Sequence, residues 1–371
     1  MRLTRAEIDR QALRYNFDGI KKKVGTDVKI MGIVKANAYG HGMIEVASTL
    51  VDFGIDHLGA GFLEEGITLR EKGVRVPILV LGGVLGNQVR QFLEYDLEIT
   101  VSSIEIAERI EHEIQSNGGM KAKVHLKIDT GMERIGVRAE NALQFVEKVC
   151  RLKHLEVVGI YSHFATSDEK DKSFASEQLD RFRTLLDTLH NRGIEIPLRH
   201  IANSGAVLDV PDSYFSMVRP GIMLYGIYPS KETSENIPLR PVLSLKSKVV
   251  FIKEVPAGQG ISYGRKYVTS KKTRVATIPI GYGDGYSRRL TNNVEVLVGG
   301  KRCPVVGTIC MDQLMVDIGF DAQVHVGDDV VLIGRDNNET ISAWEIAEKL
   351  GTIPYEILTG IAVRVPRILV N

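Results

Sequence analysis

The segment GIVKANAYGHG (32–42) ends a run of apolar, β-forming residues on an amine. Ile33 and Val34 favour a strand that ends on Lys35, and Tyr39 stands four residues further on. A lysine that is desolvated in such a place has its neutral amine favoured, and a neutral amine can attack a carbonyl group. Lys35 is therefore a candidate nucleophile; the alternative is a solvated charge at the rim of a sheet.

Other polar side chains also stand where β-rich runs end. The run KVHLKID (123–129) carries Lys127 and Asp129, and Arg134 follows it. The later runs end on a further set of polar or small residues: His163, Asn203, Ser204, Arg219 and Gly221. Each of these alone has an ordinary structural explanation, such as a hydrogen-bonded histidine or a rim salt bridge. Their joint placement at strand ends indicates one site.

Two glycine-containing turns, Ser204-Gly205 and Pro220-Gly221-Ile222, follow the last two of these runs. Barrel proteins often bind phosphate at this point, through backbone N–H groups at the start of a short helix. Two ordinary turns are the alternative. A phosphate site facing Lys35 suggests a phosphorylated carbonyl compound held as a Schiff base, either pyridoxal phosphate or a sugar phosphate.

The elements that must position these residues alternate between β-rich runs and amphipathic helical stretches such as ENALQFVEKVCRL. Eight such units over roughly 200 residues predict an α/β fold, a closed (β/α)8 barrel of the TIM type, whose strand ends form the active face. The competing architecture is an open doubly wound sheet, but no glycine-rich dinucleotide fingerprint follows the first strand. The predicted strands are 28–36, 57–61, 77–83, 98–103, 123–129, 155–164, 198–204 and 216–226.

After residue 236 the sequence reads as strands separated by Gly, Pro and Asn turns, with little helix. One exception is SAWEIAEKLG, where Ser342 and Glu345 are spaced as a capping box at the start of a helix. We expect the barrel over 10–235 and a β domain over 236–371, which the N-terminal strand 1–9 joins.

Composition excludes several classes of partner. Forty-seven basic and 46 acidic side chains give a net charge of +1, so the chain has no electrostatic footprint for nucleic acid or an acidic membrane. The three cysteines have no CxxC spacing and read as free thiols in a reducing compartment. The first residues are too charged for a signal peptide, and no apolar run is long enough to span a membrane. We therefore expect a cytoplasmic protein.

Nine segments of the chain resemble the alanine racemases, and they occur in the order of that family. The first is GIVKANAYGHG, which resembles the family's pyridoxal-phosphate segment. The others are KIDTGMERIG (127–136), YSHFATSD (161–168), HIANSGA (200–206), VRPGIMLYG (218–226), GISYGRKY (260–267), IPIGYGDGY (278–286), GTICMDQ (307–313) and PYEI (354–357). Because they run across almost the whole chain, the resemblance covers both predicted domains.

The resemblance implies a racemase with two catalytic bases. Lys35 would carry pyridoxal 5'-phosphate as a Schiff base and act as one base, and Tyr263 of the partner subunit would be the other. One group must remove the α-proton from one face of the substrate while another returns it on the opposite face. Arg134 would tune Tyr263 and bind the substrate carboxylate.

Further contacts are implied for the cofactor and the substrate. Arg219 would donate to the pyridine nitrogen, and His163 would hydrogen-bond Arg219 and hold it in place. The remaining cofactor-binding residues would be Tyr39, Asn203, Ser204, Gly221, Ile222 and Tyr355. Met311 and Asp312 would reach the substrate from the partner chain, and Tyr282 would line the entrance. No metal is expected.

Lys127 stands where several family members carry an N-carboxylated lysine, and we hypothesise the same modification here. Thr308 stands where many members have an arginine near the entrance. Glu133 replaces a commonly small or neutral residue beside Arg134, for which it could compete.

The resemblance implies a homodimer with shared active sites and a small amino acid as substrate. These motifs do not separate alanine from serine, which differ by little more than a hydroxyl group. Two other functions remain open at this point. One is a pyridoxal-phosphate amino acid decarboxylase of the same architecture, and the other is a non-catalytic carrier of the cofactor.

Overall fold

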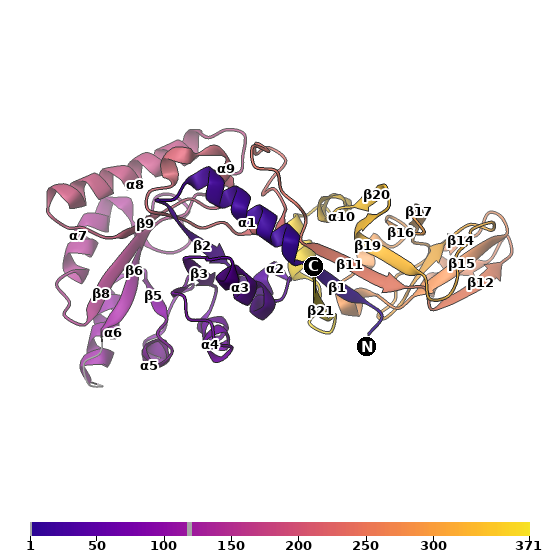
Figure 1. Ribbon diagram of the computed structural model, residues 1–371, viewed down its shortest axis with the longest axis horizontal. Coiled ribbons are helices and arrows are strands. Elements are labelled where there is room, and N and C mark those ends of the chain that lie inside the picture. Colours follow the sequence, from indigo (N-terminus) through magenta and orange to yellow (C-terminus); the bar gives the residue numbers. More distant parts are fainter. Residues whose placement is uncertain (1, 117–120) are drawn as a thin grey trace. The chain divides into compact units, whose positions relative to one another are not determined.

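A computed structural model describes residues 2–116 and 121–371 of the chain. The chain divides into two compact units. Leu13–Ala38 and Met43–Arg240 form the barrel unit, and Met1–Ala12, Tyr39–Gly42 and Pro241–Asn371 form the β unit. In Figure 1 the barrel unit runs from indigo to pink, and the β unit is mostly orange and yellow.

The barrel unit contains eight parallel strands in the order β10-β2-β3-β4-β5-β6-β8-β9. Their bounds are β2 Lys29–Ile33, β3 His57–Ala60, β4 Ile78–Val80, β5 Glu98–Val101, β6 Ala122–Asp129, β8 Leu155–Tyr161, β9 Leu198–His200 and β10 Met217–Val218. Backbone hydrogen bonds from Ser216 to Arg199 (3.2 Å) and from Arg219 to Ala202 (2.9 Å) join the two ends of this order. The sheet is thus a nearly closed barrel, which confirms the predicted fold class.

Helices connect the strands around the barrel (Figure 1). They are α1 Arg10–Val24, α3 Met43–Asp52, α4 Leu63–Glu71, α5 Val89–Glu94, α6 Ile104–Ser116, α7 Ala139–Val149, α8 Ser173–Asn191 and α9 Ser204–Asp209, and the short strand β7 Val137–Arg138 pairs with β6. Helix α7 shows the expected pattern, because Ala142, Phe145, Val146 and Val149 are buried at spacings of three and four. None of the described helices is long and apolar enough to cross a membrane.

Seven of the eight predicted barrel strands end earlier than expected, and the first and the eighth matter most for the site. The first stops at Ile33, so Lys35 lies two residues beyond the strand and begins the segment α2 Lys35–Tyr39. Ala36 to Tyr39 all have φ between 52° and 55°, so α2 is a left-handed turn. The eighth strand is only β10, because Pro220 has no N–H to donate and a 3₁₀ turn, Ile222–Tyr225, follows.

The β unit is built on a seven-stranded sheet in the order β17-β16-β19-β11-β1-β21, with β20 paired to β19. A second sheet has the order β12-β15-β18, and β13 pairs with β14. The strand bounds are β1 Arg5–Asp9, β11 Leu243–Lys248, β12 Phe251–Val255, β13 Gly260–Ile261, β14 Tyr267–Val268, β15 Thr273–Ile278, β16 Glu295–Val298, β17 Lys301–Pro304, β18 Leu314–Asp317, β19 Asp329–Asp336, β20 Glu339–Ile341 and β21 Arg367–Val370. Two helices, α10 Ala343–Leu350 and α11 Pro354–Thr359, complete the unit.

The first and last strands of the chain meet in the large sheet of the β unit. Strand β1 pairs antiparallel with β11 and parallel with β21. Ala6 and Ile8 of β1 are fully buried and alternate with half-buried residues, as a strand with one face on a core requires.

One buried arginine ties together two loops that lead into neighbouring barrel strands. The guanidinium of Arg70, on α4, donates to the carbonyls of Val74 and Val76, which precede β4 (2.9 and 2.8 Å). It also donates to Tyr95 and Asp96, which precede β5 (both 2.9 Å). These carbonyls lie at the N-terminal ends of the strands. In a barrel of this type, residues at that end contribute to stability rather than to catalysis.

Replacing Arg70 by methionine should therefore destabilise the fold. Methionine keeps the apolar stem but leaves four carbonyls without their charged donor, and the loss should be about 2–4 kcal/mol in the free energy of unfolding. Urea denaturation followed by circular dichroism measures it. Arg183→Met, on the exposed face of α8, is the matched control and should change little. Equal midpoints for the two variants would contradict this account.

Candidate active site

The left-handed turn that carries Lys35 is held at several points. Glu65 of α4 accepts from the N–H groups of Ala36 and Gly61, both at 2.7 Å, and so joins the end of β2 to the end of β3. The side chain of Asn37 accepts from the N–H of Met43 (2.9 Å). Left-handed conformations of residues with a Cβ cost roughly 1–2 kcal/mol each, so the turn persists only because its surroundings fix it.

Lys35 is half-buried, and its pKa is lowered. Burial is the main cause, the positive charges of Arg134 and Arg219 add to it, and Glu65 opposes it. The neutral amine is therefore more accessible than in a solvated lysine. This is the electrostatic condition that a nucleophilic or basic lysine requires.

Arg219 is buried at the end of β10, with four acceptors around two of its nitrogens. Nη2 donates to the carbonyls of Ser162 (2.7 Å) and Ile201 (3.2 Å) and to His163 Nδ1 (3.1 Å), and Nη1 donates to His200 Nδ1 (2.9 Å). Because arginine only donates, His163 accepts on Nδ1 and is neutral, in agreement with a pKa lowered well below its usual value by burial and by Arg219. Arg219 itself has its pKa lowered to about 10, chiefly by burial.

The turns after β9 and β10 meet through a side chain. The N–H of Gly221 donates to Ser204 Oγ (2.9 Å), and Ile222 begins the 3₁₀ turn that follows. Asn203 caps α9, because its Oδ1 accepts from the N–H of Ala206 (3.1 Å) and from Ser167 Oγ (2.7 Å). Asn203 therefore fixes the start of α9, while the first N–H groups of each turn have no partner within that turn.

The loop after β6 carries Arg134, which is exposed to solvent. Asp129 Oδ1 shapes the loop by accepting from the N–H groups of Gly131 and Met132 (2.8 and 2.9 Å). Glu133 pairs with Arg138 (2.8 Å), so its carboxylate does not compete for Arg134. Arg134 is exposed, and no hydrogen bond or ion pair joins it to any residue that the structure describes.

Lys127, at the end of β6, is buried beside the same cations. Its Nζ donates to the carbonyl of Ile128 (2.8 Å) and lies 5.2 Å from the ring centre of Tyr161. Burial first, and then the charge of Arg219, lower its pKa to about 7 despite the opposing field of Asp129. Lys127 therefore has an easily populated neutral amine.

The β unit presents a second group of predicted residues. Tyr263 is 72% exposed, and Thr308 Oγ1 donates to its carbonyl (2.7 Å). Ser262, which has φ 62°, donates through Oγ to the carbonyl of Thr308 (2.6 Å). Thr308 is buried, so it anchors the tyrosine loop rather than extending toward solvent as a long arginine would.

The other predicted residues of the β unit lie on two further segments. The N–H of Tyr282 donates to the carbonyl of Cys310 (3.0 Å), which brings Tyr282 beside Met311. Arg364 holds Asp312 through a 2.8 Å hydrogen bond. The rings of Tyr39 and Tyr355 lie 5.9 Å apart, and burial raises the pKa of Tyr39.

Sequence reasoning missed several residues of the site. Glu65 bridges two strand ends, but nothing in FLEEG distinguishes it from a solvated helix carboxylate. His200 contacts Arg219 and was visible only as part of the HIANSGA segment. Thr308 was noted as a departure from the family, without the role in holding Tyr263 that its hydroxyl performs.

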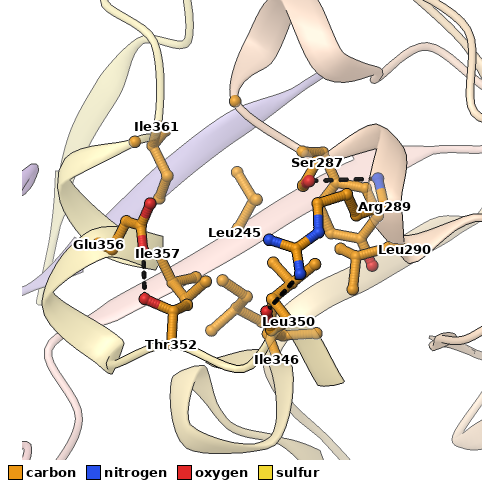
Figure 2. Close-up of a pocket in the computed structure, with 14 residues that line it drawn as sticks. Leu245, Ser287, Arg289, Leu290, Ile346, Leu350, Thr352, Glu356, Ile357 and Ile361 are labelled. Carbon is orange, nitrogen blue, oxygen red and sulfur yellow. Dashed lines mark hydrogen bonds between the residues drawn. The ribbon is translucent and has the colours of Figure 1, made fainter. Parts of the chain in front are cut away.

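A cavity of about 270 Å³ lies elsewhere in the β unit. Figure 2 shows its lining, which combines aliphatic side chains such as Leu290, Ile346 and Leu350 with polar ones, and a hydrogen bond from Arg289 to the carbonyl of Leu350 (2.9 Å). None of the residues predicted for the site lines this cavity. We therefore take it as a packing void of the sheet and its two helices.

Comparison with known proteins agrees with the fold. The family model for the N-terminal domain of alanine racemase matches residues 8–229, and the model for the C-terminal domain matches residues 242–369. An alanine racemase from Halothermothrix orenii is 50% identical over 99% of this chain and 96% of its own length. The structure of an alanine racemase from Clostridium difficile 630 is similar, with a TM-score of 0.95 and 42% identity over 99% of this chain and 95% of that one.

A more distant structure is also similar. A histidine racemase from Leuconostoc mesenteroides has a TM-score of 0.92 at 31% identity, and the match covers all of this chain and 98% of that one. The barrel, the strand-end residues and these matches define an amino acid racemase, which is an isomerase. More specifically, the chain belongs to the alanine racemase family.

The pKa of Lys127 makes a prediction about stability. The folded pKa is about 7 and the ordinary value is 10.5, so between these the unfolded chain binds a proton that the folded chain does not. The free energy of unfolding should therefore rise with pH in this window, by up to about 1.4 kcal/mol per pH unit from this group. Urea denaturation in carbon-dioxide-free buffer should show a smaller slope for Lys127→Met.

Lys123→Met is the matched control for this measurement. Lys123 lies on the same strand, β6, but is exposed and paired with Asp96 at 3.0 Å. Its removal should leave the slope unchanged. If Lys127→Met has the slope of the parent protein, Lys127 is not titrating in this window.

Proposed function

We propose that this chain interconverts L-alanine and D-alanine with bound pyridoxal 5'-phosphate and two bases, Lys35 and Tyr263. The observation that carries the proposal is the surroundings of Lys35. A half-buried lysine with a lowered pKa stands at the end of β2, in the field of the buried Arg219 at the end of β10. A lysine whose neutral amine is favoured, in the field of a buried guanidinium, suits a carbonyl compound with an electron-rich ring nitrogen.

The residues present fit this cofactor. No hydrogen bond joins Arg219 Nε to the described residues, so a donor remains for the pyridine nitrogen. The hydroxyl of Ser204, which the N–H of Gly221 holds in place, and the N–H of Ile222 suit a phosphate, whose oxygens act as acceptors. Tyr39 and Tyr355, whose rings lie 5.9 Å apart, are further phosphate contacts that the resemblance to the family implies.

When bound, pyridoxal phosphate withdraws electrons from the amino acid and makes the hydrogen on Cα acidic. Arg219 then limits this effect, because a guanidinium keeps its proton and leaves the ring nitrogen as an acceptor. Lys35 Nζ and Tyr263 Oη would hold or remove the Cα proton on opposite faces of the substrate. Arg134, which has no ion-pair partner among the described residues, would bind the substrate carboxylate.

The exposure of Tyr263 supports the proposal of a homodimer with shared sites. A catalytic base acts in a site from which water is excluded. The phenol of Tyr263 is 72% exposed, so the residues of its own unit do not shield it from water. Phe251, also exposed, lines a groove of about 390 Å³ together with Tyr263, and Met311 and Tyr282 are exposed as well. Exposed apolar residues of this kind mark a surface for a partner, here the barrel of a second copy.

The substrate is proposed to be alanine. The family models favour a racemase over the decarboxylase and carrier readings. Serine remains the alternative, and the similar histidine racemase means that the fold alone does not select a side chain. L-serine and L-histidine are therefore comparison substrates in any assay.

We also propose that Lys127 is carboxylated. An ammonium at Lys127 would be repelled by Arg219 and Arg134, and the lowered pKa supplies the neutral amine that attacks carbon dioxide. The nitrogen of the neutral amine bonds to the carbon of CO2 and loses one proton, so the neutral side chain becomes an anion. That anion could orient Arg134 by a charge-assisted hydrogen bond.

Variants of the two bases test the shared site. Lys35→Ala and Tyr263→Phe should each lose racemisation of L-alanine by a factor of about 100 or more, measured by optical rotation. When the two variants are unfolded together and reassembled, half of the dimers should be hybrids with one intact site. The mixture should then regain about a quarter of the parent activity.

Two outcomes would contradict these assignments. Full activity in Tyr263→Phe, with none in Lys35→Ala, would mean that Tyr263 is not a base. An inactive mixture that contains hybrid dimers would mean that the sites are not shared. Tyr282→Phe, which keeps the ring and removes only the hydroxyl, is the control for a phenol that is not assigned as a base.

Carboxylation has a test that avoids acid. With 13C-labelled bicarbonate, the NMR spectrum of the parent protein should contain one slowly exchanging carbamate carbon signal. Lys127→Met should lack the signal because it has no amine at this position, and Lys123→Met should keep it. Absence of the signal from the parent protein at saturating bicarbonate would count against the modification.

A further inference from the structure

A row of buried polar side chains leads through the barrel unit from Glu98 to Arg219. His125 Nε2 lies 2.9 Å from Glu98 Oε2, and His125 Nδ1 lies 2.9 Å from His200 Nε2. His200 Nδ1 in turn accepts from Arg219 Nη1 at 2.9 Å. All four side chains are buried. The inside of such a barrel is usually filled by Val, Ile and Leu, so this row needs an explanation.

The two ends of the row determine where every proton lies. Arg219 can only donate, so His200 accepts on Nδ1 and carries its proton on Nε2. His200 Nε2–H therefore donates to His125 Nδ1, which leaves the proton of His125 on Nε2. That proton is donated to Glu98 Oε2. Both imidazoles are thus neutral, and the hydrogen bonds all run in one direction, from the guanidinium to the carboxylate.

A glycine makes the row possible. His125 is on β6 and His200 on β9, and β8 lies between these two strands. Gly159 of β8 stands opposite His125 in the register, and a Cβ there would lie 2.1 Å from His125 Nδ1. The pairing of β6 with β8 also shifts register between Val124 and His125. The two imidazoles therefore meet where the intervening strand has no side chain.

The row also supplies the only carboxylate connected to Arg219 among the described residues. The acceptors that contact Arg219 are two carbonyls and two neutral imidazoles, and none is an anion. Glu98 is 5% exposed; burial would raise its pKa, but the hydrogen bond from His125 lowers it. Burial and Arg219 hold the pKa of His200 well below its usual value, as a neutral ring requires.

Glu98 and His125 have no part in the function proposed above. We propose that they are positioning residues for Arg219: the Glu98 carboxylate orders the protons of His125 and His200, so that His200 always offers Arg219 an acceptor. Because the guanidinium is planar, fixing Nη1 and Nη2 in this way also fixes the direction in which the Nε–H bond of Arg219 points. The proposal rests on the proposed function only for the cofactor that this N–H would hold.

NMR of the protein labelled with 15N-histidine tests the row directly, with the cofactor bound and again after its removal. The expected result is that His125 and His200 each carry a single proton, on Nε2. In Glu98→Gln, the amide nitrogen can donate to His125 Nε2 and reverse the row. A second tautomer should then appear at both histidines, and the dissociation constant for pyridoxal phosphate should rise about tenfold.

His57→Gln is the matched control. His57 is buried, and its Nε2 lies 4.0 Å from Glu98 Oε1, but it is outside the row. Its replacement should leave both tautomers and the cofactor affinity unchanged. His125→Phe, which interrupts the row while filling a similar volume, should weaken cofactor binding as Glu98→Gln does.

Three results would overturn the proposal. The first is a parent protein in which either histidine is charged or protonated on Nδ1, a measurement that needs no variant. The second is Glu98→Gln with a single Nε2–H tautomer at both histidines, whatever its cofactor affinity. The third is a change of tautomer with no change in cofactor affinity. A parent protein that binds no pyridoxal phosphate would instead contradict the proposed function, and the tautomers would still report on the row.

Discussion

The buried charge of Arg219 is the constraint on which the barrel unit depends. A guanidinium keeps its proton under all ordinary conditions, so its surroundings must provide acceptors instead. Its direct acceptors are two carbonyls and two imidazoles. The Glu98 carboxylate is connected to it through the rings of His125 and His200. A barrel interior that would usually be aliphatic becomes polar from β5 to β9 as a result. Removing one member of such a network costs more than its own hydrogen bond, because its neighbours are left unsatisfied.

The same charge sets the state of the amines and imidazoles around it. Arg219 contributes to the lowered pKa values of Lys35, Lys127, His163 and His200, although burial is the larger cause for each. Burial and the charge of Arg219 thus act in the same direction, and together they favour the neutral forms of these groups. A neutral lysine can act as a base or a nucleophile, and a neutral histidine can accept a hydrogen bond. The electrostatics of the interior therefore determine which reactions the residues at the strand ends can carry out.

Local pattern and strand count predicted the fold, because alternating β-rich and amphipathic segments leave few architectures. The strand-end residues could be listed for the same reason. The left-handed turn at Ala36–Tyr39 could not be predicted, since no glycine in that stretch signals positive φ. Nor could the row from Glu98 to His200: these residues lie on strands that are far apart in the sequence, and their contact depends on the register that brings Gly159 opposite His125. Ser342, in contrast, caps α10 as its spacing from Glu345 predicted.

The left-handed turn is explained by what fixes its two ends. Ala36, at the Lys35 end, belongs to the barrel unit and donates to Glu65. Gly40, just past Tyr39, belongs to the β unit: Arg367 donates to its carbonyl (2.8 Å), and a Cβ there would lie 2.0 Å from the carbonyl oxygen of Leu358. The four residues from Ala36 to Tyr39 adopt the left-handed conformation at a cost of roughly 1–2 kcal/mol each. Strain of this size is retained where the position of a side chain matters more than stability, and here that side chain is Lys35.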